Sequence, residues 1–389
     1  MAVADFVGAL GWGAFAAGSA VFFTRSVGLS AAQVGVGLSS AAAAGLLVAV
    51  PAGRLADRIG PIRVLITASL CSMVLFASYA LVHSFAAFLV VVTLLGVLQR
   101  LDRISIQAVI AGLLERGDRV RVSAFLRSVN NAGFAIGATL AGVVVALDTR
   151  PAYLALPLGN VVATGVMVSL RSRLPRVPPA PPRGEHEQRW VALRDRPFLA
   201  LTALYGLARL DGTLLDVAVP LWILHHTQAP RPLVALLAVV NTVLVVALQV
   251  RAARGTETRR GIVRAKRSAS LVMIAACFVF ASSGWVGESG AILLLIAGMT
   301  LLTAGELLIS AAGWSMVYCL ARPHAQGEYG AVFGLGTSAM QLAGPALVVL
   351  LTDRYGVVGW GAVAAVYVFV FFVIRPAMAR VGERPGLPA

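Results

Sequence analysis

Ionisable side chains lie in the middle of three long apolar stretches, and they are the residues of this chain best suited to chemistry. These stretches cover residues 85–113, 197–224 and 291–316, and their charges are Arg100, Asp102, Arg103, Arg209, Asp211, Asp216 and Glu306. A charge in the hydrocarbon of a membrane costs at least about 2.5–3.5 kcal/mol at the centre of a helix, so it needs a partner or a water-filled site. The pattern therefore predicts a polar pathway through an otherwise apolar protein.

The acidic members of this set are candidates for carrying protons. A carboxyl group that is partly removed from water can bind and release a proton as its surroundings change. Asp211 is the first choice because it lies near the middle of its stretch, and Asp216, Glu306 and Asp102 are the alternatives. Asp102 also fits a simpler role, the neutralisation of a neighbouring arginine. All of the charges in the set have a second interpretation as structural ion pairs.

The basic members of the set are candidates for binding a substrate. Arg100 and Arg103 are three residues apart, so they share one face of a helix. They can bind an anionic or carbonyl-bearing compound, or act as counter-charges to acids in the stretch 197–224. Arg209 is a further basic candidate, and it can reach toward the stretch 85–113.

Neutral polar and aromatic side chains complete the candidate substrate site, and they are Gln99, Asn131, Trp12, Phe15 and Trp222. The two amides have an alternative role, since polar side chains in helix bundles often bond only to neighbouring helices. The aromatic rings can stack on a planar substrate, and Trp222 also fits the aromatic belt at a membrane surface.

The elements that position these residues are predicted to be transmembrane helices. Hydrophobic residues make up 59% of the 389 residues and charged residues 13%, and the mean hydropathy is +0.85. That length has room for about twelve helices of roughly 20 residues each. We predict an all-α polytopic protein with one bundle at 1–170, a proline- and arginine-rich linker at 171–196 and a second bundle at 197–389. Each bundle is expected to hold half of the helices, because an offset of about 200 residues aligns similar positions.

The charge distribution predicts a multi-pass protein of the cytoplasmic membrane with both termini in the cytoplasm. The net charge is +15, and most of the 32 lysine and arginine residues lie in segments that the helix pattern puts on one side. This asymmetry is typical of the positive-inside rule, so it argues against nucleic-acid binding. The basic loops make anionic lipid headgroups expected partners. The scarcity of lysine, with Lys266 as the sole example, is typical of a GC-rich bacterial gene.

Other classes of site are not indicated. The cysteines Cys71, Cys277 and Cys319 lie in apolar contexts without metal or redox spacing, so no metal site is expected. No Gly-x-x-x-x-Gly-Lys loop occurs, so ATP-driven transport is not expected. No arrangement of a nucleophile with a base indicates an enzyme. We expect no cofactor and take the proton gradient as the energy source.

A short charged segment at residues 53–63, read as a turn, separates two apolar runs. It reads GRLADRIGPIR and resembles the loop between the second and third helices of the major facilitator superfamily, with matches that include Gly53, Asp57, Arg58, Gly60 and Arg63. The resemblance implies that the first, fourth, seventh and tenth helices line a central cavity. It also implies that this segment is a conformational gate, in which the acid interacts with the N-terminal end of the helix near Gly330. Its counterpart at 251–267, also read as a loop, keeps the charge but loses most of the glycines.

A second motif lies on the stretch that ends near residue 147. Gly133, Gly137 and Gly142 resemble the antiporter motif of drug exporters, Gly-x-x-x-Gly-Pro-x-x-Gly-Gly, although Ala138 and Ala141 replace its proline and one glycine. Small residues at this spacing also form ordinary seams where helices pack closely. The arginine that many exporters carry four residues before a glycine of the fourth helix is missing as well.

These features together predict a secondary transporter that works by alternating access. The preferred activity is proton-coupled export of a small amphipathic compound, such as an antibiotic or a secondary metabolite. An uptake permease for a small metabolite is the alternative, and a membrane receptor that no longer transports is a third hypothesis. The expected partners are a small-molecule substrate, protons and membrane lipids, and the expected state is a monomer.

Overall fold

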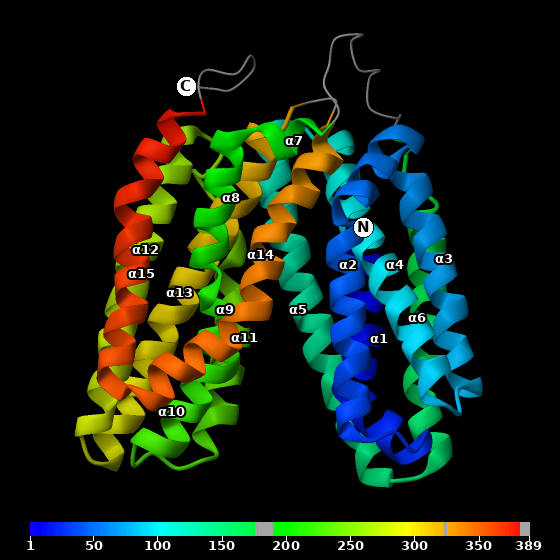
Figure 1. Cartoon of the computed structure of the whole chain (residues 1–389), viewed down its shortest axis with the longest axis horizontal. Coiled ribbons are helices and arrows are strands. Elements are labelled where there is room, and N and C mark those ends of the chain that lie inside the picture. Colours follow the sequence, from blue (N-terminus) through cyan, green and yellow to red (C-terminus); the bar gives the residue numbers. More distant parts are fainter. Residues whose placement is uncertain (176, 178–189, 323–324, 382–389) are drawn as a thin grey trace. The chain divides into compact units, whose positions relative to one another are not determined.

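The computed structural model describes residues 1–175, 177, 190–322 and 325–381 (Figure 1). Every regular element in these ranges is a helix. Eleven of the helices are long and apolar enough to cross a membrane. A further segment, 196–226, lies where another span is expected but is broken into shorter pieces. The prediction of an all-α protein of the polytopic membrane class is confirmed, whereas residues 176 and 178–189 of the predicted linker lie outside the described residues.

The long helices of the first half follow one another with short connections. They are α1 (Ala2–Val21), α2 (Ala31–Ile59), α3 (Pro61–Ser78), α4 (Phe85–Leu113), α5 (Arg116–Leu147) and α6 (Arg150–Arg171). Side chains at three of the N-termini satisfy backbone N–H groups that a helix leaves unpaired. Ser30 and Gln33 form a reciprocal capping box on α2, while Ser84 caps α4 and Thr149 caps α6.

The second half contains shorter elements as well. They are α7 (Val191–Arg194), α8 (Arg196–Ala208), α9 (Leu210–Thr213), the π-helix η3 (Leu214–Ala218), α10 (Val219–His226), α11 (Leu233–Ala252), α12 (Arg259–Ser282), α13 (Glu288–Leu320), α14 (Gln326–Val348) and α15 (Gly356–Ala379). The start of α12 corrects the expectation of a loop at 251–267, because residues 259–267 already belong to this helix.

The chain folds into two compact units, and each contains a short segment from the other half of the sequence. Unit 1 comprises Met1–Glu115, Phe125–Glu187 and Arg322–Ala331. Unit 2 comprises Arg116–Ala124, Gln188–Ala321 and Val332–Ala389. The beginning of α14 therefore belongs to unit 1, and the beginning of α5 belongs to unit 2.

Aromatic rings of α1, α4 and two short helices, η1 (Phe22–Ser26) and η2 (Tyr79–Leu81), pack together in the core of unit 1. The ring of Phe15 stacks on Tyr79 with centroids 5.6 Å apart, and Phe23 lies 4.5 Å from Phe88. Such rings bury large apolar areas and favour offset-stacked or edge-to-face contacts at these separations. Phe15 is buried in this core, so it packs against its own bundle rather than facing a substrate cavity.

Close packing of α5 on α1 depends on two of the three glycines of the small-residue motif. A Cβ atom on Gly133 would lie 2.6 Å from the carbonyl oxygen of Phe6, and one on Gly137 would overlap the carbonyl of Leu10. Gly142 differs, because among the described residues no atom from a neighbouring helix lies within 4 Å of the position that its Cβ would take. The seam is therefore shorter than the sequence motif.

The charged segment 53–63 is mainly helix, which corrects the expectation of a turn. Helix α2 continues to Ile59, and Gly60 alone breaks the chain before Pro61 opens α3. The φ angle of Gly60 is +103°, a conformation that side-chain-bearing residues rarely adopt. The residues before it are compatible with a helix, so the change of direction needs only this glycine.

Candidate functional site

The stretch 197–224 was expected to form one continuous helix, and the structure shows a break in its middle. Helix α8 ends at Ala208, and Arg209 has a ψ angle of 7° before α9 and η3 begin. The N–H of Arg209 is shared by the carbonyls of Tyr205 and Gly206, each at 3.0 Å. The hydroxyl of Tyr367 donates to the carbonyl of Ala208 at 3.4 Å. Irregular backbone at membrane depth is tolerated where protein covers it or where it lines a cavity.

The break brings Arg209 and Asp211 into an ion pair. Their Nη1 and Oδ2 atoms are 2.8 Å apart, and Asp211 is completely buried. In a regular helix, side chains two residues apart point to opposite sides and cannot pair in this way. The sequence identified both residues as candidates but did not pair them with each other, because it gave no sign of the break.

Lys266 is a buried basic side chain that the sequence analysis predicted to lie in a loop. It lies on α12 with 1% of its surface exposed, and its Nζ is 4.3 Å from the centroid of the Tyr205 ring. It interacts electrostatically with Asp211. Among the described residues, its Nζ has no hydrogen-bond partner. The one signal in the sequence was that this residue is the sole lysine in an arginine-rich protein.

Two further acids lie in unit 2. Glu306 on α13 is buried, and its Oε2 accepts a hydrogen bond from the Asn241 amide at 3.1 Å. The same amide nitrogen donates to the hydroxyl of Thr303 at 3.0 Å. Asp216 is exposed on η3 and interacts electrostatically with Glu306 and Arg209. Unit 2 therefore gathers three of the four candidate proton carriers, together with Arg209 and Lys266.

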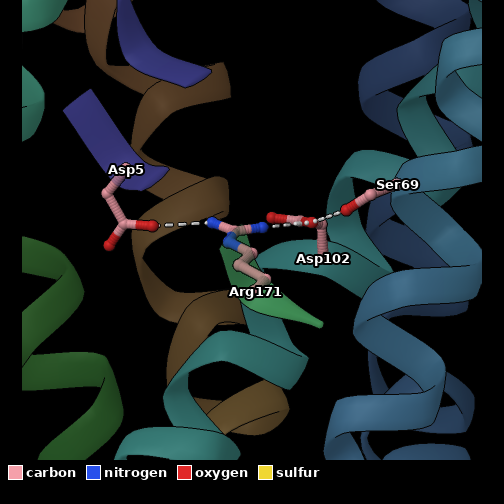
Figure 2. A network of polar contacts seen from close by, with 4 residues as sticks. All are labelled: Asp5, Ser69, Asp102 and Arg171. Atoms are coloured by element: carbon pink, nitrogen blue, oxygen red, sulfur yellow. Dashed lines mark hydrogen bonds and ion pairs between the residues drawn. The ribbon is translucent and has the colours of Figure 1, made fainter. Parts of the chain in front are cut away.

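The fourth acid, Asp102, belongs to a separate buried network in unit 1 (Figure 2). Its Oδ1 is 3.0 Å from Nη1 of Arg171 and accepts a hydrogen bond from the Ser69 hydroxyl at 2.7 Å. Nη2 of Arg171 is 2.8 Å from Oδ1 of Asp5, and both of these side chains are buried. The network ties α1, α3, α4 and α6 together, so the simpler role of Asp102 as a counter-charge fits the structure.

Sequence reasoning missed Arg171 and Asp5 as members of this network. Both residues lie near the ends of apolar stretches, where charges are common and carry little information. The arginines that were considered on α4 have other surroundings, since Arg100 is half-buried and Arg103 is exposed. Gln99 and Asn131 are also half-buried in the same unit.

The tryptophan candidates differ in their surroundings. Trp12 is 38% exposed and meets Phe76 edge to face. Trp222 is 2% exposed, its indole N–H donates to the Ser283 hydroxyl at 3.0 Å, and its ring stacks on His226. Trp222 is therefore a core residue of unit 2 and not a member of an exposed aromatic belt.

Asp57, near the C-terminal end of α2, contacts the N-terminal end of α14. This part of α14 belongs to unit 1, as Asp57 does. Its carboxylate accepts hydrogen bonds from the backbone N–H groups of Gly327, at 2.8 Å, and Glu328, at 3.1 Å. A negative charge at this end of a helix is favoured by the helix dipole. A Cβ on Gly53 would overlap the carbonyl of Gly327, so close backbone approach requires glycine there. The gate candidates Arg58 and Arg63 have exposed side chains.

Comparison with known proteins identifies the family. A family model described as Major Facilitator Superfamily matches residues 1–345. The chain belongs to the major facilitator superfamily. It is a transporter of small molecules and not an enzyme, in agreement with the superfamily fold of its structural neighbours.

Several solved structures of transporters share the fold of this superfamily member. A human organic anion transporter superposes with a TM-score of 0.72 and 17% identity over 96% of this chain and 97% of that chain. A bacterial homologue of the iron transporter ferroportin superposes with a TM-score of 0.75 and 14% identity over 98% of both chains. A proton:xylose symporter superposes with a TM-score of 0.72 and 12% identity over 96% of this chain and 94% of that chain. Identities this low show the fold alone, and none of the curated proteins compared with it matches the chain in sequence.

Proposed function

We propose that this protein is a proton-coupled exporter of a small amphipathic compound and that Asp211 carries the proton. The observation that carries the proposal is the completely buried Asp211 carboxylate, paired with Arg209 at 2.8 Å where the helix is broken. Transporters of this type place their binding and coupling groups at discontinuous helices. A buried acid beside such a break is positioned to exchange its proton as access alternates.

The surroundings of Asp211 supply a way for protonation to change the structure. When the carboxyl group takes up a proton, Arg209 loses its anionic partner, and an unpaired buried cation is costly. Arg209 also interacts electrostatically with Glu306, so this second acid offers an alternative counter-charge within the same unit. Moving Arg209 between the two acids would shift the segment around the break and so couple proton binding to access.

Lys266 sets the electrostatic environment of Asp211 in this account. Its amine is buried beside Tyr205 and interacts with the Asp211 carboxylate without a direct hydrogen bond. A neighbouring cation stabilises the ionised form of an acid, so it makes proton release easier. Lys266 is therefore a positioning residue, and it is not required to touch the substrate.

Export is the preferred direction because of the seam between α1 and α5. Two glycines of the exporter-like motif make the close contacts expected of it, at Gly133 and Gly137. Uptake is the alternative, and the altered motif favours it, as does the fold shared with a proton:xylose symporter. The proposed setting is the cytoplasmic membrane of a bacterium, with both termini in the cytoplasm and the segment 53–63 acting as the gate.

The experiment that tests the proposal compares the accumulation of a panel of antibiotics and dyes in cells that express wild type, Asp211→Asn or no transporter. Wild type should lower the accumulation of at least one compound, and both the substitution and a protonophore should abolish the difference. The matched control is Asp195→Asn, which removes an acid at the start of α8, away from the break. Higher accumulation with wild type would establish uptake, and no effect on any compound would contradict the export proposal.

A further inference from the structure

A cavity of about 610 Å³ opens between α12 and α15 in unit 2, away from the broken helix. The two helices pack side by side, as Figure 1 shows for the yellow-green α12 and the red α15. The cavity lies at the N-terminal end of α12 and the C-terminal end of α15. Neither the proposed transport mechanism nor the superfamily comparison assigns a role to it.

The residues that line the cavity form two layers, a basic level of arginines and an apolar level below it. Five arginines form the basic level, and they are Arg259, Arg260, Arg264, Arg267 and Arg375. Leu271 continues the α12 face one turn further into the helix, and Phe371 lies one turn before Arg375 on α15. Residues three and four apart share a face of a helix, so each helix presents cations at its end and apolar side chains toward its middle.

Among the described residues, the wall of the cavity contains arginines but no acidic side chain. Five guanidinium groups around one cavity repel one another, because each keeps its charge at all accessible pH values. The repulsion would be relieved by an anion that carries more than one charge and contacts several of the arginines at once.

One of these arginines is held in place by a ring. The Arg267 guanidinium carbon is 4.1 Å from the centroid of the Phe371 ring. A cation–π contact of this kind holds the guanidinium group against the ring. A planar, preoriented guanidinium binds phosphate oxygens through two parallel hydrogen bonds.

We propose that this cavity binds an anionic phospholipid whose headgroup carries two phosphates, of the cardiolipin class. Two phosphates match a group of five arginines better than the single phosphate of other anionic lipids. The apolar level distinguishes a lipid from a free phosphate, since Leu271 is 55% exposed and acyl chains would cover it. Basic pockets between transmembrane helices are known to bind headgroups of this kind. The site is separate from Asp211, so it stands independently of the transport proposal.

Binding of four probes to the purified full chain tests the site. The probes are cardiolipin, phosphatidylglycerol, phosphatidylcholine and inorganic pyrophosphate, and the readouts are native mass spectrometry and the apparent Tm in detergent. Wild type should bind cardiolipin at least tenfold more tightly than phosphatidylglycerol, and should show no binding of phosphatidylcholine. The triple variant Arg264→Gln/Arg267→Gln/Arg375→Gln should lose cardiolipin binding at least tenfold. The matched control Arg121→Gln/Arg231→Gln/Arg354→Gln removes three exposed arginines elsewhere and should bind as wild type does.

Two single variants guard against misfolding of the triple variant, and the pyrophosphate probe separates a lipid headgroup from free phosphate. Phe371→Ala should weaken cardiolipin binding severalfold. It removes the ring that holds Arg267 in place, and it also removes an apolar side chain that would contact the acyl chains. Arg267→Lys keeps the charge and should also weaken binding, because an ammonium lacks the planar fork. Equal binding of pyrophosphate and cardiolipin would overturn the lipid proposal in favour of a free-phosphate site. Unchanged cardiolipin binding by the folded triple variant or by both single variants would overturn the site itself.

Discussion

The carboxylate of Asp211 pairs with the guanidinium of Arg209, two residues earlier, because the helical segment is broken at Arg209. The pair has an Nη1 to Oδ2 distance of 2.8 Å, and Asp211 is completely buried. A local departure from helical geometry thus creates an ion pair inside an apolar bundle. The pair interacts electrostatically with the buried Lys266, and together they form the candidate coupling site of unit 2.

The pair itself can be tested by removing each partner and then both. Arg209→Gln leaves a buried carboxylate without its cation, and breaking a buried pair costs about 3–5 kcal/mol. We expect a large fall in the apparent Tm for this variant and a partial recovery in Arg209→Gln/Asp211→Asn, in which both members of the pair are neutral. Thermal unfolding in detergent measures both. A double variant that is less stable than Arg209→Gln would contradict the pairing.

Lys266 provides a test that separates an electrostatic role from a structural one. Lys266→Met should fold at least as stably as wild type, because the buried amine makes no hydrogen bond to the described residues and Asp211 keeps its pair with Arg209. It should move the pH profile of transport toward higher pH, because a carboxylic acid that loses a neighbouring cation holds its proton more tightly. Lys266→Arg keeps a positive charge and should stay close to wild type. Identical pH profiles for wild type and Lys266→Met would refute this role.

The unit 1 network predicts a large stability effect without a direct effect on coupling. Arg171→Met leaves two carboxylates, Asp5 and Asp102, facing each other without their shared cation, and it should cost about 3–5 kcal/mol. Arg173→Met is the matched control, because Arg173 is exposed two residues further on. Thermal unfolding of the two variants should separate them clearly. Equal melting temperatures would show that the network does not hold the four helices together.

Substitution of alanine should change stability in opposite directions at two glycines of α5. Gly137→Ala places a Cβ against the Leu10 carbonyl and should destabilise unit 1, whereas the position of a Cβ on Gly142 is open. Gly142→Ala should therefore be neutral or stabilising by up to about 1 kcal/mol, the usual advantage of alanine within a helix. The apparent Tm measures this contrast. Equal destabilisation by the two substitutions would mean that the seam extends further than the structure shows.

Much of the fold was predictable because hydropathy and segment length determine which segments can cross a membrane. Runs of apolar residues identified the spans, and the GRLADRIGPIR segment identified the family. The helical state of residues 53–59 was not predicted, because charged residues and glycine suggest a turn when neighbouring elements are unknown. Only Gly60, with a φ angle of +103°, actually requires one.

The candidate site was predictable in its members but not in its pairings. Asp211, Asp216 and Glu306 were found because charges are rare within apolar stretches. Lys266 and Arg171 were missed because both lie near the ends of their stretches, where a charge usually faces water or headgroups. Their burial depends on the helices that pack over them, and a single sequence does not show which helices those are.

Proton release on substrate binding tests the central claim most directly. A compound whose accumulation the transporter lowers is added to purified wild type and Asp211→Asn in weakly buffered detergent solution, and the change in pH is recorded. Antiport through Asp211 predicts that the compound displaces a proton from wild type and none from Asp211→Asn, with Asp195→Asn behaving as wild type does. Equal proton release from wild type and Asp211→Asn, or none from either, would contradict the account.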